Sequence, residues 1–196
     1  MITERLELVP ATVDLCRAEA RGRDAIEQAL GVRVPASWPP AVFEPNDVER
    51  IRRRLERDPG NQAWTLHYIV LREPVVGGRR ELLGVAGYAG PPSADGEVQV
   101  GYAIAEEYQR QGYATEAVKA LVAGAFESPG VVVITATTYA VLEPSIGVLR
   151  KTGFSQIGSD PVTGLLRYER RRDRARGPAP GCGLTPRSSG RGLVFG

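Results

Sequence analysis

Alternation of apolar and polar positions along the chain predicts a series of short β-strands. Over residues 63–72, for example, side chains of unlike character alternate from Trp64 to Val70, as expected for a strand with two different faces. Residues 131–138 form an unbroken run of mostly β-branched side chains, which is typical of a strand covered on both faces. The predicted strands comprise residues 3–9, 63–72, 81–89, 97–105, 131–138, 154–157 and 165–170.

Helical spacing of apolar residues, together with capping residues, predicts helices between these strands. Thr12 can cap the first helix, and Asn46 or Asp47 can cap the third. Gly31 and Gly153 stand where the second and the last helix are expected to end. The predicted helices span residues 12–22, 24–30, 48–57, 115–126 and 144–151.

The order of these elements predicts the fold class. One strand is followed by three helices, a meander of three strands, and then helix, strand, helix and a closing pair of strands. This order favours an α/β (α+β) fold with a mixed, largely antiparallel central sheet flanked by helices. The glycine patterns of Rossmann and Walker-type phosphate loops are absent from the sequence, which disfavours nicotinamide and ATP chemistry.

The segment QRQGYA at residues 109–114 lies between a predicted strand and a predicted helix. Backbone N–H groups at a helix start have no intrahelical partners and, together with the helix dipole, favour an anion. Gly112 allows a ligand to approach the backbone closely, and Ala114 keeps the neighbouring side chain small. The residues alone therefore predict a phosphate or pyrophosphate loop at a helix N-terminus.

Composition is that of an ordinary soluble domain, because 42% of the 196 residues are hydrophobic and 24% are charged. The net charge of +2 is unevenly distributed. Residues 171–196 contain six arginines and one aspartate, so they carry +5, which leaves −3 for residues 1–170. Arginine, glycine, proline and serine dominate near the end, and we predict a folded domain over residues 1–172 and a disordered tail over residues 173–196.

Cysteine and hydropathy patterns limit the remaining classes. Cys16 and Cys182 lie far apart, which predicts neither a disulfide framework nor a metal site. The sequence has no apolar run of about 18 residues and no apolar signal core, so we expect a cytoplasmic protein without a membrane partner. Nucleic acid is not expected as a partner, because the basic segments lack interleaved aromatic residues and a recognition fold.

Two features leave alternatives open. Trp38 stands between prolines in a rigid loop over residues 35–40, where it can be a packing residue or one wall of a substrate mouth. The helix over residues 48–57 has a face rich in arginine. A solvated face is favoured there over a surface for an acidic partner.

Three segments carry a resemblance to a known family. Residues 100–117 (VGYAIAEEYQRQGYATEA) resemble the acetyl-CoA segment of GNAT N-acetyltransferases. Residues 144–154 (PSIGVLRKTGF) resemble a second segment of the Rim-type branch, which acetylates protein N-termini and assorted small amines. TERLEL at residues 3–8 is similar to the first strand of that branch. The resemblance spans about residues 3–170 and implies a GNAT-like acyl-CoA N-acyltransferase fold for the domain at residues 1–172.

The resemblance implies transfer of an acetyl group from acetyl-CoA, as cosubstrate and without a metal, to a primary amine. The acceptor is expected to be a protein or peptide N-terminus or a small amine, and the protein a monomer or homodimer. Two positions depart from the family pattern: Leu142 replaces an asparagine that can bind the pantetheine arm, and Gln99 replaces a common glutamate. These departures keep open a catalytically inactive CoA-binding regulatory or interaction module.

The resemblance also implies which residues hold the cosubstrate. Loop and helix-start residues are expected to bind the pyrophosphate mainly through backbone N–H groups, and the preceding strand is expected to bind pantetheine as an added strand would. A basic residue on the last helix can meet the adenosine phosphates or be a solvated helix end. The residues that the resemblance implies for cosubstrate binding are Tyr102, Ala103, Ile104, Gln109, Arg110, Gln111, Gly112, Tyr113, Ala114, Thr115 and Lys151.

Candidates for the acid that protonates the departing thiolate come from the same resemblance. Many relatives use a tyrosine at the position held here by Leu149, and Ser145 is the candidate in its place. Alternatively, Ser145 only caps the helix that begins at Pro144.

For the base, the sequence offers Glu97, Glu143 and the single histidine, His67. Glu97 is expected to share a strand face with Gln99 and could act through water. His67 has a suitable ordinary pKa, but a lone histidine in a strand is more often packed than catalytic. A water chain with no single dedicated base is a further alternative.

Overall fold

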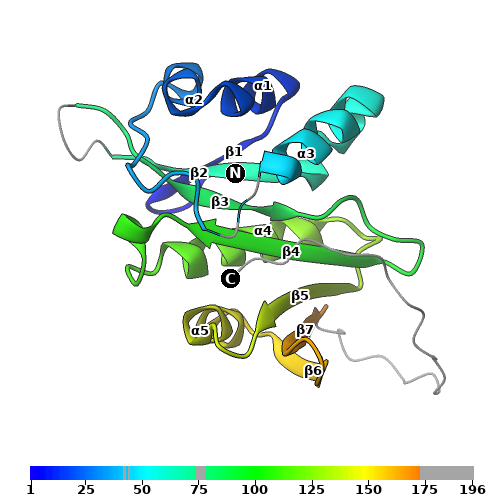
Figure 1. The fold of residues 1–196 in the computed structure, drawn as a ribbon. Helices are drawn as coiled ribbons and strands as arrows, with labels where there is room; N and C mark the ends of the chain where they lie inside the picture. The colour runs from blue at the N-terminus through cyan, green and yellow to red at the C-terminus, as the bar shows by residue number, and fades with distance from the viewer. Residues whose placement is uncertain (42, 44, 74–77, 173–196) are drawn as a thin grey trace.

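The computed structural model describes residues 1–172 apart from 42, 44 and 74–77, and the predicted tail at 173–196 lies outside the described residues. Strands and helices follow the predicted order (Figure 1). They are β1 (Leu6–Pro10), α1 (Val13–Arg21), α2 (Arg23–Leu30), α3 (Pro45–Arg57), the 3-10 helix η1 (Pro59–Trp64), β2 (Leu66–Leu71), β3 (Leu82–Tyr88), β4 (Glu97–Ile104), the 3-10 helix η2 (Glu106–Tyr108), α4 (Tyr113–Glu127), β5 (Val133–Tyr139), α5 (Glu143–Lys151), β6 (Ser155–Ser159) and β7 (Leu165–Arg171).

The strands form one seven-stranded sheet in the order β1-β2-β3-β4-β5-β7-β6. All neighbouring pairs are antiparallel except β4 and β5, which are parallel. Helix α4 provides the long crossover that a parallel pair needs. The predicted fold class, a mixed and largely antiparallel sheet flanked by helices, is confirmed.

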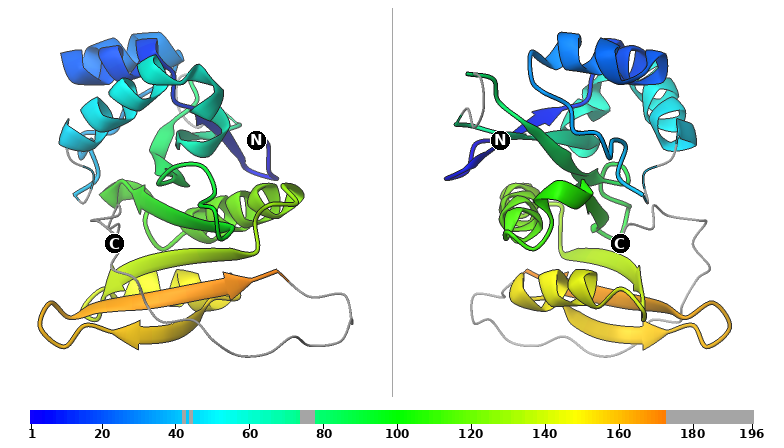
Figure 2. Two further views of the ribbon diagram at one scale, coloured as in Figure 1. Left: turned by 90° about the vertical axis from the view of Figure 1, so that its right-hand side faces the viewer. Right: turned by 60° about the vertical axis from the view of Figure 1, so that its left-hand side comes forward.

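Helices lie on both faces of the sheet (Figure 2). A hydrophobic core lies on each face. On one face, Leu121 of α4 and Leu149 of α5 pack in the same core as Tyr102 of β4. On the other face, α1, α2 and α3 cover Tyr68 of β2 and Ala103 of β4. Because helices cover both faces, every residue of β2 and β3 is buried, and the alternation of these strands is between two cores rather than between core and water.

The pairing of β4 with β5 is short, and this shapes the centre of the molecule. Residues 97–99 of β4 pair with residues 133–135 of β5, and the rest of β4 pairs with β3 alone. We call this divergence of residues 100–104 from β5 the splay. It divides the sheet into a part with β1–β4 and a part with β5–β7, seen one above the other in Figure 1.

Predicted boundaries at the N-terminal ends of several elements need correction. β1 begins at Leu6 rather than at residue 3, and β5 begins at Val133 rather than at residue 131. β2 begins at Leu66 rather than at residue 63, because the preceding residues form the 3-10 helix η1, which Asp58 caps by accepting from Gly60 N–H. α4 begins at Tyr113, two residues earlier than predicted, because Gly112 already ends the loop in the left-handed region.

The start of α3 also differs from the prediction. This helix begins at Pro45, so Asn46 and Asp47 lie in its first turn and neither is its cap. A proline is favoured at this position because its missing N–H would have no intrahelical partner there.

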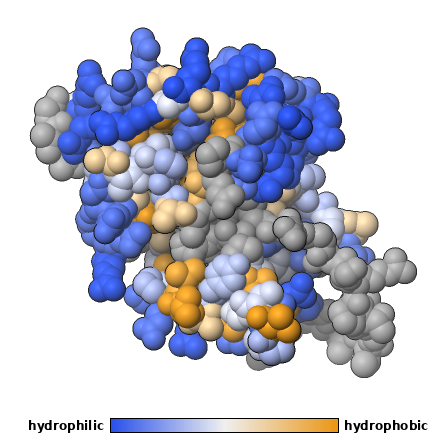
Figure 3. All heavy atoms as spheres, in the orientation of Figure 1, coloured by the Kyte–Doolittle hydropathy of each residue, from blue (hydrophilic) through white to orange (hydrophobic). Residues whose placement is uncertain are grey.

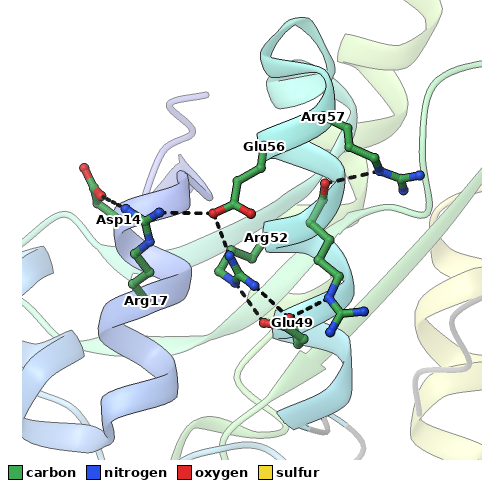
Figure 4. Close-up of polar contacts among 7 residues, drawn as sticks. Asp14, Arg17, Glu49, Arg52, Glu56 and Arg57 are labelled. Atoms are coloured by element: carbon green, nitrogen blue, oxygen red, sulfur yellow. Dashed lines mark hydrogen bonds and ion pairs between the residues drawn. The ribbon is translucent and has the colours of Figure 1, made fainter.

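Carboxylates pair with several arginines of the arginine-rich face of α3 (Figure 4). Arg52 binds Glu49 at 2.7 Å and Glu56 at 2.6 Å, and Arg17 of α1 reaches Glu56 at 3.1 Å. Arg53 binds Glu49 at 2.6 Å. Hydrogen bonds from Arg52 and Arg53 lower the pKa of Glu49 to about 2. Arg54 and Arg57 instead donate to backbone carbonyls, those of Ala89 and Arg53. Ion pairs thus occupy much of this solvated face, which favours the first of the two alternatives.

The loop with Trp38 joins the helix layer to the end of β4. The indole Nε1 of Trp38 donates to Glu19 Oε1 at 2.6 Å, and its ring lies 6.4 Å from that of Tyr68. The neighbouring Ser37 donates from its backbone N–H to Glu107 of η2 at 3.2 Å. Trp38 therefore has a packing role, and the loop is attached next to the predicted phosphate loop.

Exposed apolar side chains concentrate in the β5–β7 part. The surface over α1–α3 is largely hydrophilic, and apolar surface is visible at the lower end of the molecule, where β5–β7 lie (Figure 3). Val141 and Val162 are 85% and 91% exposed, and Ile157 of β6 is 55% exposed. The two parts of the sheet thus present surfaces of different polarity.

Candidate active site

The predicted phosphate loop leads from η2 into α4. Arg110 and Gly112 both have left-handed backbones, with φ of 60° and 85°. The N–H of Glu116 closes the first helical turn on the carbonyl of Gly112 at 3.0 Å. The N–H groups of residues 113–115 then have no intrahelical acceptor and point out of a 15-residue helix at its positive end.

The loop has the features of an anion cradle. A Cβ added at Gly112 would lie 3.4 Å from Nη2 of Arg5, and the φ of +85° is one that side chains rarely adopt. Gln109, Arg110 and Gln111 are exposed, so their backbone and side chains are accessible. Bare N–H donors, a small residue and a nearby guanidinium together fit a pyrophosphate group.

Sequence reasoning missed the role of Arg5. Its Nε donates to Glu116 Oε2 at 2.7 Å, its Nη1 donates to the Gln111 carbonyl at 3.1 Å, and its guanidinium lies 4.5 Å from the ring centre of Tyr113. Thr3 Oγ1 also donates to Glu116, at 2.6 Å. The TERLEL segment was visible in the sequence, but no local pattern connects it with a helix more than a hundred residues away.

The carboxylate of Glu116 is the centre of this clamp. Partial burial alone would raise its pKa, but hydrogen bonds from Thr3 and from the backbone and side chain of Arg5 bring the pKa below its ordinary value. Glu116 is therefore ionised at neutral pH and fixes the guanidinium beside the loop. Its negative charge is offset by Arg5 at the place where an anion would bind.

Within the described part of the chain, the splay leaves backbone groups of β4 without a strand partner. Ala105 N–H donates to Leu83 O at 2.8 Å and Ala89 N–H donates to Gln99 O at 2.9 Å. Because antiparallel bonding alternates, the odd-numbered residues of β4 bond to β3, and Tyr102 and Ile104 direct their backbone groups toward the splay. The side chain of Gln109 already donates to the carbonyl of Ile104, at 3.1 Å.

Ala103, one of the three predicted pantetheine contacts, has a different environment. It pairs with Val85, so its backbone groups are used by β3. Its side chain is buried among the helices α1–α3. Of the predicted stretch, Tyr102 therefore retains its backbone N–H and carbonyl for an added strand, and Ile104 retains its N–H, since its carbonyl accepts from Gln109.

Ser145 lies in the first turn of α5 and is bonded to β4. The hydroxyl of Tyr102 is 3.0 Å from both Oγ and the carbonyl O of Ser145. Leu142 is the N-cap of α5, and among the described residues no side chain caps this helix start. The alternative that Ser145 is only a helix cap is therefore wrong. Lys151 is exposed in the last turn of the same helix.

The candidate bases occupy different faces. Glu97 and Gln99 share one face of β4, as predicted, and it is the face on which Ala103 packs against α1–α3. Glu97 is exposed and accepts from Thr135 Oγ1 at 2.9 Å. Gln99 donates to Thr137 Oγ1 at 3.3 Å. Ser145 lies on the opposite face, so the structure does not bring Ser145 and Glu97 together on one side of the sheet.

His67 is a packed residue. It is 4% exposed, its ring meets Tyr88 edge-on at 6.3 Å, and Nδ1 lies 3.1 Å from the carbonyl O of Thr65. Burial, with a smaller contribution from the N-terminal ammonium, lowers its pKa to about 4. A neutral, enclosed imidazole supports the packed alternative. Glu143 is exposed in the first turn of α5.

The match to a protein family covers most of the chain. A family model described as an acetyltransferase (GNAT) domain matches residues 5–155. The chain belongs to the GNAT acetyltransferase family. The matched range of this GNAT chain contains the loop, the splay and α5.

Individual relatives are distant. The chain is 26% identical over 152 residues to the uncharacterized N-acetyltransferase YjdG of Bacillus subtilis (strain 168). The aligned residues make up 78% of this chain and 87% of that protein. A putative GnaT-family acetyltransferase from Bordetella pertussis superposes with a TM-score of 0.59 at 20% identity, over 87% of this chain and 98% of the other. RimL, described as a ribosomal L7/L12 alpha-N-protein acetyltransferase in complex with coenzyme A, gives 0.58 at 17% identity, over 88% and 97%. At these identities the solved structures show the shared fold.

Across residues 1–172, with the gaps noted above, no three His, Cys, Asp or Glu side chains are grouped so that they could hold a metal ion. No helix in the same residues combines the length and apolar character needed to cross a membrane. Cys16 is a buried residue of α1, and burial raises the pKa of its thiol to about 11.

Proposed function

We propose that this GNAT chain transfers the acetyl group of acetyl-CoA to a primary amine. The observation that carries the proposal is the splay directly beside an anion cradle at the start of α4. A protein or peptide N-terminus is the first candidate acceptor, and a small amine is the second. The name of RimL, which refers to a ribosomal protein N-terminus, supports the first acceptor class only as an analogy.

Binding of the cosubstrate is assigned to two adjacent features. Backbone N–H groups of residues 110–115 hold the pyrophosphate, with the positive end of α4 and Arg5 contributing favourable charge. Tyr102 and Ile104 hold the pantetheine arm by backbone hydrogen bonds, as a neighbouring strand would. Lys151 is assigned to the adenosine phosphates. Leu142 leaves these contacts without the amide that relatives can use.

Acetyl-CoA supplies the acetyl group as a thioester whose sulfur leaves as a thiol. A backbone N–H at Tyr102 or Ile104 is assigned to polarise the thioester carbonyl. Donors of this type are worth about 3 kcal/mol in the transition state. Both N–H groups are fixed in a strand, so this donor requires no rearrangement when charge develops.

Two side chains are assigned to the proton transfers. Glu97 accepts, through water, the proton that the acceptor nitrogen loses as the C–N bond forms. Ser145 Oγ donates a proton to the departing sulfur as the C–S bond breaks and recovers one from water. Because the two side chains lie on opposite faces of β4, this assignment requires the amine to arrive on one side of the strand and the thiol to leave on the other.

The inactive CoA-binding module is the second candidate, and Gln99 and Leu142 are the observations that favour it. A thiol-release assay with acetyl-CoA, run against N-terminal peptides and a panel of small amines, separates the two. Acetyl transfer predicts thiol release that depends on both the amine and the enzyme. Binding of CoA by calorimetry with no release across the whole panel would replace the enzyme proposal by the module.

A further inference from the structure

The hydroxyl group of Tyr102 in β4 contacts Ser145, the candidate acid. Tyr102 Oη lies 3.0 Å from Ser145 Oγ and 3.0 Å from the Ser145 carbonyl O. Both residues are buried, at 5% and 4% exposure. Tyr102 belongs to the half of β4 that has left β5, so the contact joins α5 directly to the splay.

The phenol has one proton for two neighbours. The carbonyl of Ser145 can only accept, whereas its hydroxyl can donate or accept. When Tyr102 donates to the carbonyl, Ser145 donates to Tyr102 and its proton is directed at the phenol. When Tyr102 donates to Oγ, the Ser145 proton is free to leave, and the phenol stabilises the negative charge that develops on Oγ.

We propose that Tyr102 is a positioning residue that fixes the hydroxyl of Ser145 and turns its own proton from the Ser145 carbonyl to Oγ as Ser145 donates. This inference rests on the proposed acetyl transfer. One proton passes from Ser145 to the departing sulfur, one returns to Ser145 from water, and Tyr102 keeps its own. Burial raises the pKa of Tyr102 to about 12, against the lowering effect of the Ser145 hydrogen bond, so the phenol is a donor at neutral pH.

The chain offers a matched control for the loss of a buried tyrosine hydroxyl. Tyr168 of β7 lies in the same core as Tyr102 and is 1% exposed. Its hydroxyl binds Gln156 at 3.4 Å instead of Ser145. Tyr102→Phe and Tyr168→Phe therefore remove the same atom from the same core, and only the first loses the contact to Ser145.

The first experiment separates turnover from binding. Tyr102→Phe is expected to lower kcat about tenfold, a fraction of the effect of a complete general acid. The KM for acetyl-CoA and the calorimetric affinity for CoA should stay within about twofold, because no cosubstrate contact is removed. Tyr168→Phe should leave all three unchanged. An unchanged kcat in Tyr102→Phe, or an equal loss in Tyr168→Phe, overturns the inference.

A double variant tests whether Tyr102 acts through Ser145. In a Ser145→Ala background, Tyr102→Phe should lower kcat no further, because the residue it positions is already gone. The same further loss in both backgrounds would show that the effect of Tyr102 does not pass through Ser145. That result would overturn the inference while leaving acetyl transfer itself intact.

A fluorine NMR measurement that needs no substrate tests the contact between Tyr102 and Ser145. In protein labelled with 3-fluorotyrosine, the fluorine resonance of Tyr102 is identified by its loss in Tyr102→Phe. Ser145→Ala should shift this resonance, whereas Ser155→Ala, a change at an exposed position of β6, should not. An unmoved resonance contradicts the inference. Absence of thiol release from the unaltered protein would instead contradict the proposed function.

Discussion

At the scale of single residues, Gly112 is the position of the predicted phosphate loop that least tolerates a side chain. Its φ of 85° lies in the left-handed region, and its α-carbon faces the guanidinium of Arg5. Any side chain there combines backbone strain with obstruction of the cradle. Arg110, with a φ of 60°, adopts the same region two residues earlier. The loop thus places two such residues immediately before the N–H groups of α4.

Gly112→Glu is expected to reduce CoA affinity about a hundredfold or more, because a carboxylate would stand at the proposed pyrophosphate site and interactions between like charges cost several kcal/mol. Isothermal calorimetry with CoA measures the effect. Gly31→Glu is the control, since Gly31 has a similar φ of 64° with nothing within 4 Å of an added Cβ. Near-normal affinity of Gly112→Glu would remove the loop from the cofactor site.

His67 links stability to pH. Its folded pKa of about 4 lies below its ordinary value of 6.5, so the unfolded chain takes up a proton first as the pH falls. Its contribution is complete above pH 6.5 and is lost between about pH 6.5 and 4, by roughly 3 kcal/mol at most. His67→Gln removes this titration from a chain with one histidine. Urea unfolding at pH 7 and pH 4 should show a larger loss for the unaltered protein; parallel losses would contradict a neutral buried imidazole.

At the scale of elements, the segment before β1 and the first turn of α4 form one unit. Thr3 and Arg5 both bind Glu116, and Arg5 also binds the carbonyl of Gln111. The loop is therefore held from outside as well as by its own backbone. The rigid position of Arg5 places a charged donor at the cradle before any ligand arrives, which reduces the ordering cost of binding.

Arg5→Met should weaken CoA binding about tenfold, because charge-assisted hydrogen bonds to phosphate are lost. Arg72→Met is the control, since Arg72 holds the same segment through the carbonyls of Thr3 and Glu4, at 2.9 and 3.0 Å. Glu116→Gln should bind CoA about as well as the unaltered protein, because the amide oxygen can still accept from Arg5 and a negative charge near the cradle is removed. Equal weakening in Arg5→Met and Glu116→Gln would mean that the clamp only shapes the loop.

Prediction from the sequence succeeded where a local pattern determines the element. Thr12 caps α1 as predicted, because its hydroxyl and the N–H of Leu15 lie within one turn. It failed at the start of α3, because Asn46 and Asp47 resemble caps equally well inside a first turn. The Tyr102–Ser145 contact and the Arg5–Glu116 clamp were not predicted, since they join residues 43 and 111 positions apart. Such contacts depend on the tertiary arrangement, and no local spacing encodes them.

At the scale of the whole molecule, the splay organises the candidate site. The family resemblance placed the cosubstrate along β4, but the sequence could not show which backbone groups are free. The register with β3 provides this, because it commits the odd-numbered residues of β4 and leaves Tyr102 and Ile104. The same register separates Glu97 from Ser145 by placing their faces on opposite sides of the sheet.

A chain ending after Arg172 is expected to keep full CoA affinity and thermal stability, since β7 ends at Arg171 and its pairing with β5 is then complete. A chain ending after Glu169 should melt several degrees lower. It loses the hydrogen bonds of Arg170 to Thr152 and of Arg172 to Val131 and Ser128. Differential scanning fluorimetry compares the three lengths. Loss of CoA affinity in the chain that ends after Arg172 would give residues 173–196 a part in the site.

The splay also affects the stability and self-association of the protein when no cosubstrate is bound. Unpaired strand edges inside a sheet can template pairing with other chains, and most proteins cover or charge them. If coenzyme A occupies this opening as an extra strand, it also shields the edge, and it stabilises the folded chain in proportion to its free concentration. A depleted pool of coenzyme A would then expose a self-association site as well as stop acetylation, so abundance and activity of the protein would decline together.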